Sequence, residues 1–175
     1  PYASDERCCQ KTTLSFVDSV AEILSPLLAG VSLVVVDEVT AKDPRALVRL
    51  VAHEGGTRLL VVPSLLRALL GLDESALIKL ECVRCWVTSG ERLEPDLERA
   101  FRSRFPAAVL LNLYGSSEVS ADATCFNTAE RGERAGSLIG RPIANTHAYV
   151  LDGQMNPVPV GVSGELHIGG DGLAR

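Results

Sequence analysis

The sequence predicts an α/β fold in which helical crossovers join the strands of a parallel sheet, followed by the start of a β-rich subdomain. Short apolar runs rich in β-branched residues alternate with amphipathic segments that begin at Pro and end at Gly or Pro. The connections between them are short, which is typical of strand–helix–strand units. From about Ile143 the pattern changes to short runs separated by Gly and Pro. We therefore expect residues 1–142 to form a partial α/β core and residues 143–175 to begin a β-barrel-like subdomain that the chain truncates.

The elements of the core follow one another in a regular order. Leu47, Leu50 and Val51 share one face of a helix that opens at Pro44 and stops at Gly55. The helix predicted at 63–71 begins at Pro and ends at Gly, and the one at 95–105 begins at Pro and is followed by Pro106. The predicted strands are short apolar runs. The sequence predicts helices over 16–28, 43–55, 63–71 and 95–105, and strands over 31–36, 57–62, 83–88 and 107–113. Residues 147–152, 157–159 and 164–168 predict short antiparallel strands.

Composition excludes several classes of protein. Hydrophobic residues make up 46% of the 175 residues, so a sizeable core can be buried. The richest apolar stretch, residues 23–36, is interrupted by Ser25, Pro26, Gly30 and Ser32, so we expect no membrane span. The net charge is -5 and the basic residues are scattered, which gives no nucleic-acid-binding surface.

The five cysteines do not form a disulfide pattern. An odd count without regular spacing is typical of a reducing compartment, so we expect a cytoplasmic protein. Cys82 and Cys85 have the CxxC spacing of a zinc half-site or redox pair. No second CxxC or His pair completes a metal site, and two reduced structural cysteines are the favoured interpretation.

Residues 112–118 (NLYGSSE) follow the last predicted strand of the core and contain the most informative polar side chains. Loops after parallel strands gather at one sheet edge, where ligands bind, and residues 89–92 reach the same edge. Tyr114 offers a flat ring, and Gly115 lets the backbone approach a ligand. Two serine hydroxyls can donate to phosphate oxygens, and Glu118 is a hard ligand suited to Mg²⁺. Alone, the segment is also typical of an ordinary polar loop.

The order of motifs along nearly the whole chain resembles the adenylate-forming (AMP-binding) superfamily of acyl-CoA synthetases, luciferases and nonribosomal peptide synthetase adenylation domains. The blocks most similar to the peptide synthetase branch begin at Phe16, Asn112 and Gly164. In order, the matching blocks are 16–22 (FVDSVAE), 28–30 (LAG), 63–66 (PSLL), 89–91 (SGE), 112–118 (NLYGSSE), 140–142 (GRP) and 164–175 (GELHIGGDGLAR).

The resemblance implies ATP-dependent activation of a carboxylic acid as acyl-AMP, followed by transfer to a thiol. That thiol is phosphopantetheine on a carrier domain, expected in the same full-length chain, or coenzyme A. By the same resemblance Tyr114 stacks on adenine, Asn112 hydrogen-bonds its edge, and Gly115 allows close approach. Gly90 and Glu91 flank the adenine. Ser117 meets the phosphate and Glu118 binds Mg²⁺, which makes these two the candidate catalytic residues.

The sequence departs from the family pattern in two ways. Ser116 stands where the peptide synthetase pattern commonly has Pro, and Ser117 replaces Thr but keeps the hydroxyl. The phosphate loop expected upstream is absent, as are the ribose-binding Asp, the hinge and the mobile domain with its catalytic Lys expected downstream. We expect the 175-residue fragment alone to be inactive and only marginally stable.

The resemblance also identifies an acid pocket with a β-alanine-type signature. Val17 replaces the Asp that anchors an α-amino group, and Asp18 follows it, so Asp18 and Asp122 could hold a β-ammonium. Taken singly, Asp18 is equally typical of a solvated helix start and Asp122 of a loop carboxylate. The pocket positions are Val17, Asp18, Ala21, Leu60, Val87, Ser89, Leu113, Ala121 and Asp122.

Three functions therefore stay open from the sequence. The first is an adenylation domain that activates β-alanine or a similar β-amino acid for a carrier thiol. The second is an acyl- or aryl-CoA ligase, because Val17 suits an acid without an α-amine. The third is a nucleotide-binding module that has lost catalysis.

Overall fold

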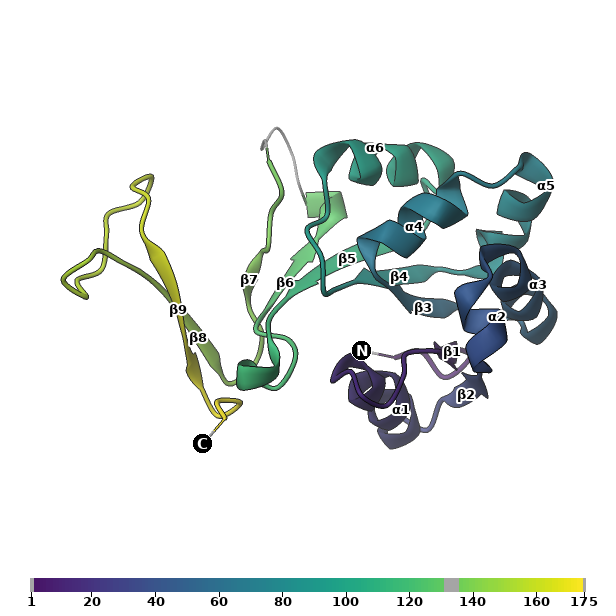
Figure 1. The fold of residues 1–175 in the computed structure, drawn as a ribbon, viewed down its shortest axis with the longest axis horizontal. Coiled ribbons are helices and arrows are strands. Elements are labelled where there is room, and N and C mark those ends of the chain that lie inside the picture. The colour runs from purple at the N-terminus through teal and green to yellow at the C-terminus, as the bar shows by residue number, and fades with distance from the viewer. Residues whose placement is uncertain (1, 131–135, 175) are drawn as a thin grey trace.

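The computed structural model describes residues 2–130 and 136–174, so Arg175 of the glycine-rich block lies outside them. A seven-stranded sheet has the order β2-β1-β3-β4-β5-β6-β7 (Figure 1). Strands β1 to β5 pair in parallel, whereas β6 and β7 are antiparallel. The predicted α/β class with a mainly parallel sheet is confirmed. The strands are β1 (Arg7–Gln10), β2 (Ser32–Val35), β3 (Arg58–Val61), β4 (Cys85–Thr88), β5 (Val109–Tyr114), β6 (Thr124–Asn127) and β7 (Arg141–Pro142).

Local capping chemistry explains where the helix at Pro44–Glu54 begins and ends. Asp43 accepts hydrogen bonds from the backbone N–H groups of Arg45 and Ala46, and Gly55 ends that helix at a φ of 65°. The α-helices are α1 (Asp18–Leu28), α2 (Glu38–Lys42), α3 (Pro44–Glu54), α4 (Pro63–Leu70), α5 (Glu74–Leu77) and α6 (Pro95–Arg104). Three 3₁₀ helices are η1 (Ile78–Cys82), η2 (Ser117–Val119) and η3 (Thr128–Glu130).

One face of the sheet carries the hydrophobic core. Alternate strand residues such as Leu59, Trp86 and Leu110 are buried against α3, α4 and α6. The ring of Trp86 meets Phe101 edge-on at 5.6 Å and stacks on Phe105 at 5.5 Å between centroids. The intervening strand residues point to the opposite face, where α1 packs against β1 and β2.

The N-terminal part of the sheet differs from prediction. Strand β1 was not predicted, because its four residues (RCCQ) present no apolar run, yet it lies between β2 and β3 with Cys8 and Cys9 buried. The strand predicted at 31–36 is present as β2, but it is less buried than its apolar run indicates. Strand β2 is an edge strand, and Val35 is 72% exposed.

Two other boundaries also need correction. Helix α1 begins at Asp18 instead of Phe16, because the N–H of Phe16 closes a turn with the carbonyl of Thr13. The predicted strand at 157–159 reduces to an isolated bridge between Pro157 and Leu151. The proline there has no N–H to donate to a ladder.

Residues after β7 form a separate two-stranded antiparallel sheet of β8 (Thr146–Leu151) and β9 (Glu165–Gly170). Figure 1 shows this hairpin standing apart from the seven-stranded sheet. Gly170 has a φ of 131°, and a Cβ there would overlap the carbonyl oxygen of Asn145, so the strand end requires glycine. The domain boundary after residue 142 stays a prediction.

Membrane-spanning helices and clusters of metal-binding side chains can be sought in the described residues. Across residues 2–130 and 136–174, no helix is long and apolar enough to cross a membrane. The same ranges contain no group of three or more His, Cys, Asp or Glu residues placed to hold a metal ion. Cys82 and Cys85 are free thiols, and the Cys82 Sγ donates to the carbonyl of Lys79 at 3.2 Å.

Candidate functional site

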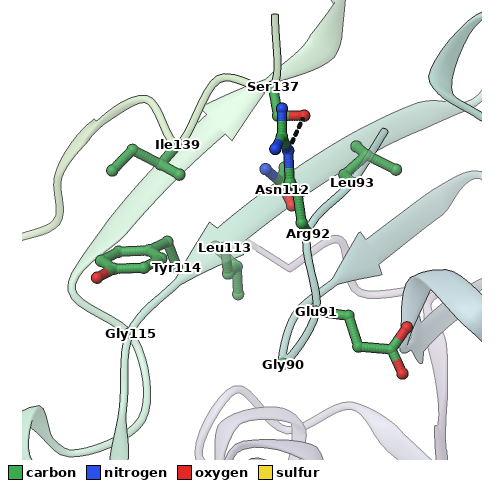
Figure 2. A pocket seen from close by; sticks show the side chains of 10 residues that line it. All are labelled: Gly90, Glu91, Arg92, Leu93, Asn112, Leu113, Tyr114, Gly115, Ser137 and Ile139. Carbon is green, nitrogen blue, oxygen red and sulfur yellow. Dashed lines mark hydrogen bonds between the residues drawn. The ribbon is translucent and has the colours of Figure 1, made fainter. Parts of the chain in front are cut away.

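A cavity of about 390 Å³ opens at the carboxyl ends of β4 and β5 (Figure 2). It contains five residues predicted to bind nucleotide: Gly90, Glu91, Asn112, Tyr114 and Gly115. The structure adds residues that sequence reasoning missed or assigned elsewhere, which are Arg92, Leu93, Leu113, Ser137 and Ile139. Ser137 and Ile139 precede β7 and carry no local signal that relates them to β5.

The ring of Tyr114 forms one side of this cavity. Tyr114 is the last residue of β5 and is 43% exposed, so its ring is available to a ligand. Figure 2 shows the side chain of Ile139 beside the same space. A flat aromatic ring with an apolar neighbour is suited to stacking a planar base.

Asn112 and the segment before β7 form another part of the cavity wall. Its Nδ2 donates to the carbonyl of Leu138 at 2.8 Å, and its Oδ1 lies 3.2 Å from the hydroxyl of Thr88. The Arg92 Nε also reaches this wall, donating to the Ser137 Oγ at 3.0 Å. Asn112 retains one amide hydrogen and one acceptor position for a ligand.

The loop after β5 folds back tightly on itself. A Cβ at Gly115 would overlap the carbonyl oxygen of Ala121, so only glycine permits this approach. Ser120 and Ala121 both have positive φ, at 59° and 81°. The Ala123 N–H donates to the carbonyl of Tyr114 at 2.8 Å and closes the loop. The turn brings Asp122 to the end of β4, where the Ser89 Oγ lies 3.4 Å from the Asp122 Oδ1.

Ser117 and Glu118 lie in η2 with exposed side chains, outside the set of residues that line the 390 Å³ cavity. A hydrogen bond from the Ser116 side chain lowers the pKa of Glu118, so its carboxylate stays ionised, as Mg²⁺ binding requires. The glycine-rich C-terminal block supports this loop. The Ala174 N–H donates to the Glu118 carbonyl at 2.8 Å, and Ser120 Oγ donates to the Gly172 carbonyl at 2.7 Å.

A second cavity, of about 210 Å³, lies on the sheet face opposite the core. Five predicted acid-pocket residues line it: Ala21, Leu60, Val87, Leu113 and Asp122. Residues that sequence reasoning did not identify also line it, namely Tyr2, Cys8, Cys9, Glu22, Ser25, Pro26, Arg58 and Leu111. Because Leu60, Val87 and Leu113 alternate with core residues along their strands, the strand period places them on this face.

Asp18 lines a neighbouring cavity of about 620 Å³, which also contains Leu60. The two aspartates nevertheless interact. The pKa of Asp122 is raised to about 6, first by burial and then by the negative charge of Asp18, while a hydrogen bond from Ser89 opposes the rise. Burial also raises the pKa of Asp18, and the positive charge of Lys11 opposes that rise. A cation between the two carboxylates would relieve their repulsion.

Three further residues were predicted to line the acid pocket: Val17, Ser89 and Ala121. Ser89 and Ala121 are buried, and Ser89 Oγ contacts Asp122. Val17 is the residue immediately before α1. None of these three is among the residues that line the 210 or 620 Å³ cavity in the described parts of the chain.

A buried ion pair between Lys11 and Glu22 connects α1 to the segment that precedes it. The side chains of Lys11 and Glu22 are 9% and 2% exposed, and the Lys11 Nζ lies 4.0 Å from the Glu22 Oε1. The Glu22 Oε2 accepts from the backbone N–H groups of Lys11 and Thr12 at 3.0 and 2.8 Å. These contacts join α1 to the segment that follows β1.

Comparison with known proteins relates this geometry to a family. Tyrocidine synthase 3 from Brevibacillus parabrevis is 37% identical over 174 residues, covering 99% of this chain and 3% of that protein. The beta-alanyl-bioamine nonribosomal peptide synthetase ebony from Drosophila melanogaster is 38% identical over 188 residues, covering 99% of this chain and 21% of that protein. The chain thus spans about a fifth or less of these relatives.

A solved structure shares the fold over the whole chain. The structure of holo-PA1221, an NRPS protein containing adenylation and PCP domains bound to vinylsulfonamide inhibitor, has a TM-score of 0.89 and 28% identity, covering 100% of this chain and 30% of that one. The family model described as AMP-binding enzyme matches residues 1–175. The chain therefore belongs to the AMP-binding enzyme family.

Proposed function

We propose that this chain supplies the nucleotide site and acid pocket of an adenylation domain of the nonribosomal peptide synthetase type. The protein activates a carboxylic acid with ATP as acyl-AMP and passes the acyl group to a phosphopantetheine thiol on a carrier domain. Membership of the AMP-binding enzyme family supports this, as do the names of relatives that are peptide synthetases. Holo-PA1221 contains adenylation and PCP domains together, which supports a carrier domain as the partner.

The chain's own residues would act by binding and orientation. Tyr114 stacks on the adenine ring, Asn112 uses its remaining amide hydrogen or acceptor at the base edge, and Gly90 brings the loop backbone alongside. The Ser117 hydroxyl donates to a phosphate oxygen. These contacts hold the α-phosphate in line with the acid, which lowers the entropic part of the barrier.

Mg²⁺ fits the exposed carboxylate of Glu118. The lowered pKa of this group keeps a hard anionic oxygen available near the predicted phosphate position. When bound there, the ion would neutralise phosphate charge.

We further propose that the acid is β-alanine or a similar β-amino acid. The feature that carries this is the pair of half-buried carboxylates, Asp18 and Asp122, which line neighbouring cavities. Together with burial, the charge of Asp18 contributes to the raised pKa of Asp122. Moving an ammonium one carbon away from the carboxylate requires its counter-charge to move as well, and Val17 removes the counter-charge from the α position. A relative, ebony, is named as a beta-alanyl-bioamine nonribosomal peptide synthetase, which adds support for β-alanine.

The alternatives predict different chemistry at the same pocket. For an acyl- or aryl-CoA ligase, Val17 is suitable but two carboxylates would be buried without a cation, which is costly. For a catalytically inactive module, nucleotide binding would persist without turnover. We also propose that residues 143–175 begin a β-rich subdomain, because β8 and β9 form their own sheet.

ATP–pyrophosphate exchange by the full-length protein tests the proposal. A panel of β-alanine, α-alanine, propionate and benzoate should show the highest kcat/KM for β-alanine, and acyl transfer should require the carrier thiol. Preference for propionate or benzoate with coenzyme A would establish the ligase instead. Bound ATP without exchange for any acid would establish the inactive module.

A further inference from the structure

We infer that Glu91 is a positioning residue. Its carboxylate binds the N-terminus of α4 and so anchors the loop between two cavities, the 390 Å³ nucleotide cavity and the 620 Å³ cavity that Asp18 lines. The inference deepens the proposed function and rests on it. Glu91 was predicted to bind nucleotide as part of the loop that flanks adenine, but its side chain engages the protein itself.

The anchor consists of two hydrogen bonds to one residue. The backbone N–H of Ser64 donates to the Glu91 Oε2 at 2.8 Å, and the Ser64 hydroxyl donates to the Glu91 Oε1 at 2.8 Å. Ser64 follows Pro63, the first residue of α4, where N–H groups have no partner within the helix. A carboxylate at this end also interacts favourably with the helix dipole.

The anchored loop separates two cavities. Gly90 and Glu91 are the residues that line both the 390 Å³ cavity with Tyr114 and the 620 Å³ cavity with Asp18. Gly90 has a φ of 82°, so this part of the loop has a conformation that few other residues adopt. A displacement of the loop would therefore change the shape of both cavities together.

The direction of the side chain argues against direct contact with the base. Figure 2 shows the Glu91 carboxylate extending away from Tyr114 and Asn112. Both of its oxygens accept hydrogen bonds from Ser64, so these two bonds hold the carboxylate in a direction that leads away from the base site. We therefore assign Glu91 the role of holding the backbone of the loop after β4 against the start of α4.

Four variants of the full-length protein test the inference: Glu91→Ala, Glu91→Gln, Ser64→Ala and the Ser64→Ala/Glu91→Ala double variant. Glutamine can accept from the Ser64 N–H and donate to its hydroxyl oxygen, so Glu91→Gln should stay within about threefold of wild type. Glu91→Ala should lower kcat/KM for both ATP and acid by about tenfold or more. Ser64→Ala should cost about fivefold alone and almost nothing in the Glu91→Ala background.

Amide hydrogen exchange without substrates supplies a readout independent of catalysis. Glu91→Ala should accelerate exchange at the Ser64 amide, whereas Glu91→Gln should not. Asp96→Ala is the matched control, because it removes another exposed carboxylate that contacts α4, through Arg67 at 3.1 Å. That variant should leave exchange at Ser64 and activity unchanged.

Two results would overturn the inference. One is unchanged exchange at Ser64 in Glu91→Ala, and the other is an equal loss of activity in Glu91→Gln and Glu91→Ala, which would make Glu91 a direct charged ligand. A wild-type protein that activates no acid would reject the proposed function instead. The hydrogen-exchange comparison would then still decide whether the anchor exists.

Discussion

The Oγ of Ser89 lies 3.4 Å from the Oδ1 of Asp122, which joins the end of β4 to the loop after β5. This hydrogen bond favours the ionised carboxylate, but burial and the charge of Asp18 outweigh it, and the pKa of Asp122 is raised to about 6. Binding of an ammonium requires the ionised form. In the proposed acid pocket, the contact therefore influences the pH range over which Asp122 can bind an ammonium.

We predict that kcat/KM for β-alanine in the full-length protein falls as pH drops through about 6, because protonated Asp122 loses its charge. Ser89→Ala should move the midpoint to higher pH, since it removes the interaction that lowers this pKa. Exchange assays across the acid range, with KM for ATP as the control, measure both effects. A midpoint that does not respond to Ser89→Ala would contradict the assignment.

We predict that Asp122→Asn stabilises the chain above pH 6. A carboxyl whose folded-state pKa is raised from 3.8 to about 6 destabilises the fold progressively as pH rises through that window, and fully above it. Thermal unfolding should show a Tm gain at neutral pH that disappears below pH 3.8. Asp96→Asn is the control: Arg67 lowers the pKa of Asp96, so that substitution should give no gain.

We predict that Asp18→Ala removes the preference for β-alanine over propionate. One of two partly buried carboxylates would be lost, and its interaction with a buried ammonium corresponds to roughly a hundredfold in kcat/KM. The KM for ATP should change little, because Asp18 does not line the cavity with Tyr114. Retained selectivity in the exchange panel would reject the two-carboxylate pocket, although adenylation itself would survive.

We predict that Tyr114→Ala weakens ATP binding by roughly 1–3 kcal/mol, the range for stacking of a base on an aromatic ring. Tyr114→Phe keeps the ring and should retain most of the affinity. Equilibrium binding of ATP measures the difference. Equal losses in both variants would assign the effect to the hydroxyl group instead of the ring.

We predict that Gly115→Ala destabilises the chain by at least about 2 kcal/mol, because its Cβ would overlap the carbonyl oxygen of Ala121. The matched control is Gly153→Ala, where nothing lies within 4 Å of the added Cβ. Urea unfolding of the two variants gives the comparison. A similar free energy of unfolding in both would show that the loop after β5 relaxes without cost.

The sequence alone was sufficient for the elements whose signals are local. Strands β3, β4 and β5 and helices α3, α4 and α6 lie within a few residues of their predicted positions. Their boundaries depend on side-chain periodicity, Pro at helix starts and the Asp43 cap, all within a few residues of one another. Since parallel strands align their carboxyl ends, the loops at Gly90 and Tyr114 could also be predicted to meet.

Only the tertiary structure decided which distant groups share a site. Strand β1 has no apolar pattern of its own, and its place in the sheet depends on pairing with β2 and β3. Ile139 and Tyr114 line one cavity although they come from different segments of the chain. Together with burial, the negative charge of Asp18 raises the pKa of Asp122, which lies more than a hundred residues later. The outward direction of Glu91 depends on Ser64, 27 residues earlier. Sequence periodicity reports which face a residue occupies, whereas the partner across that face is selected by packing of the whole chain.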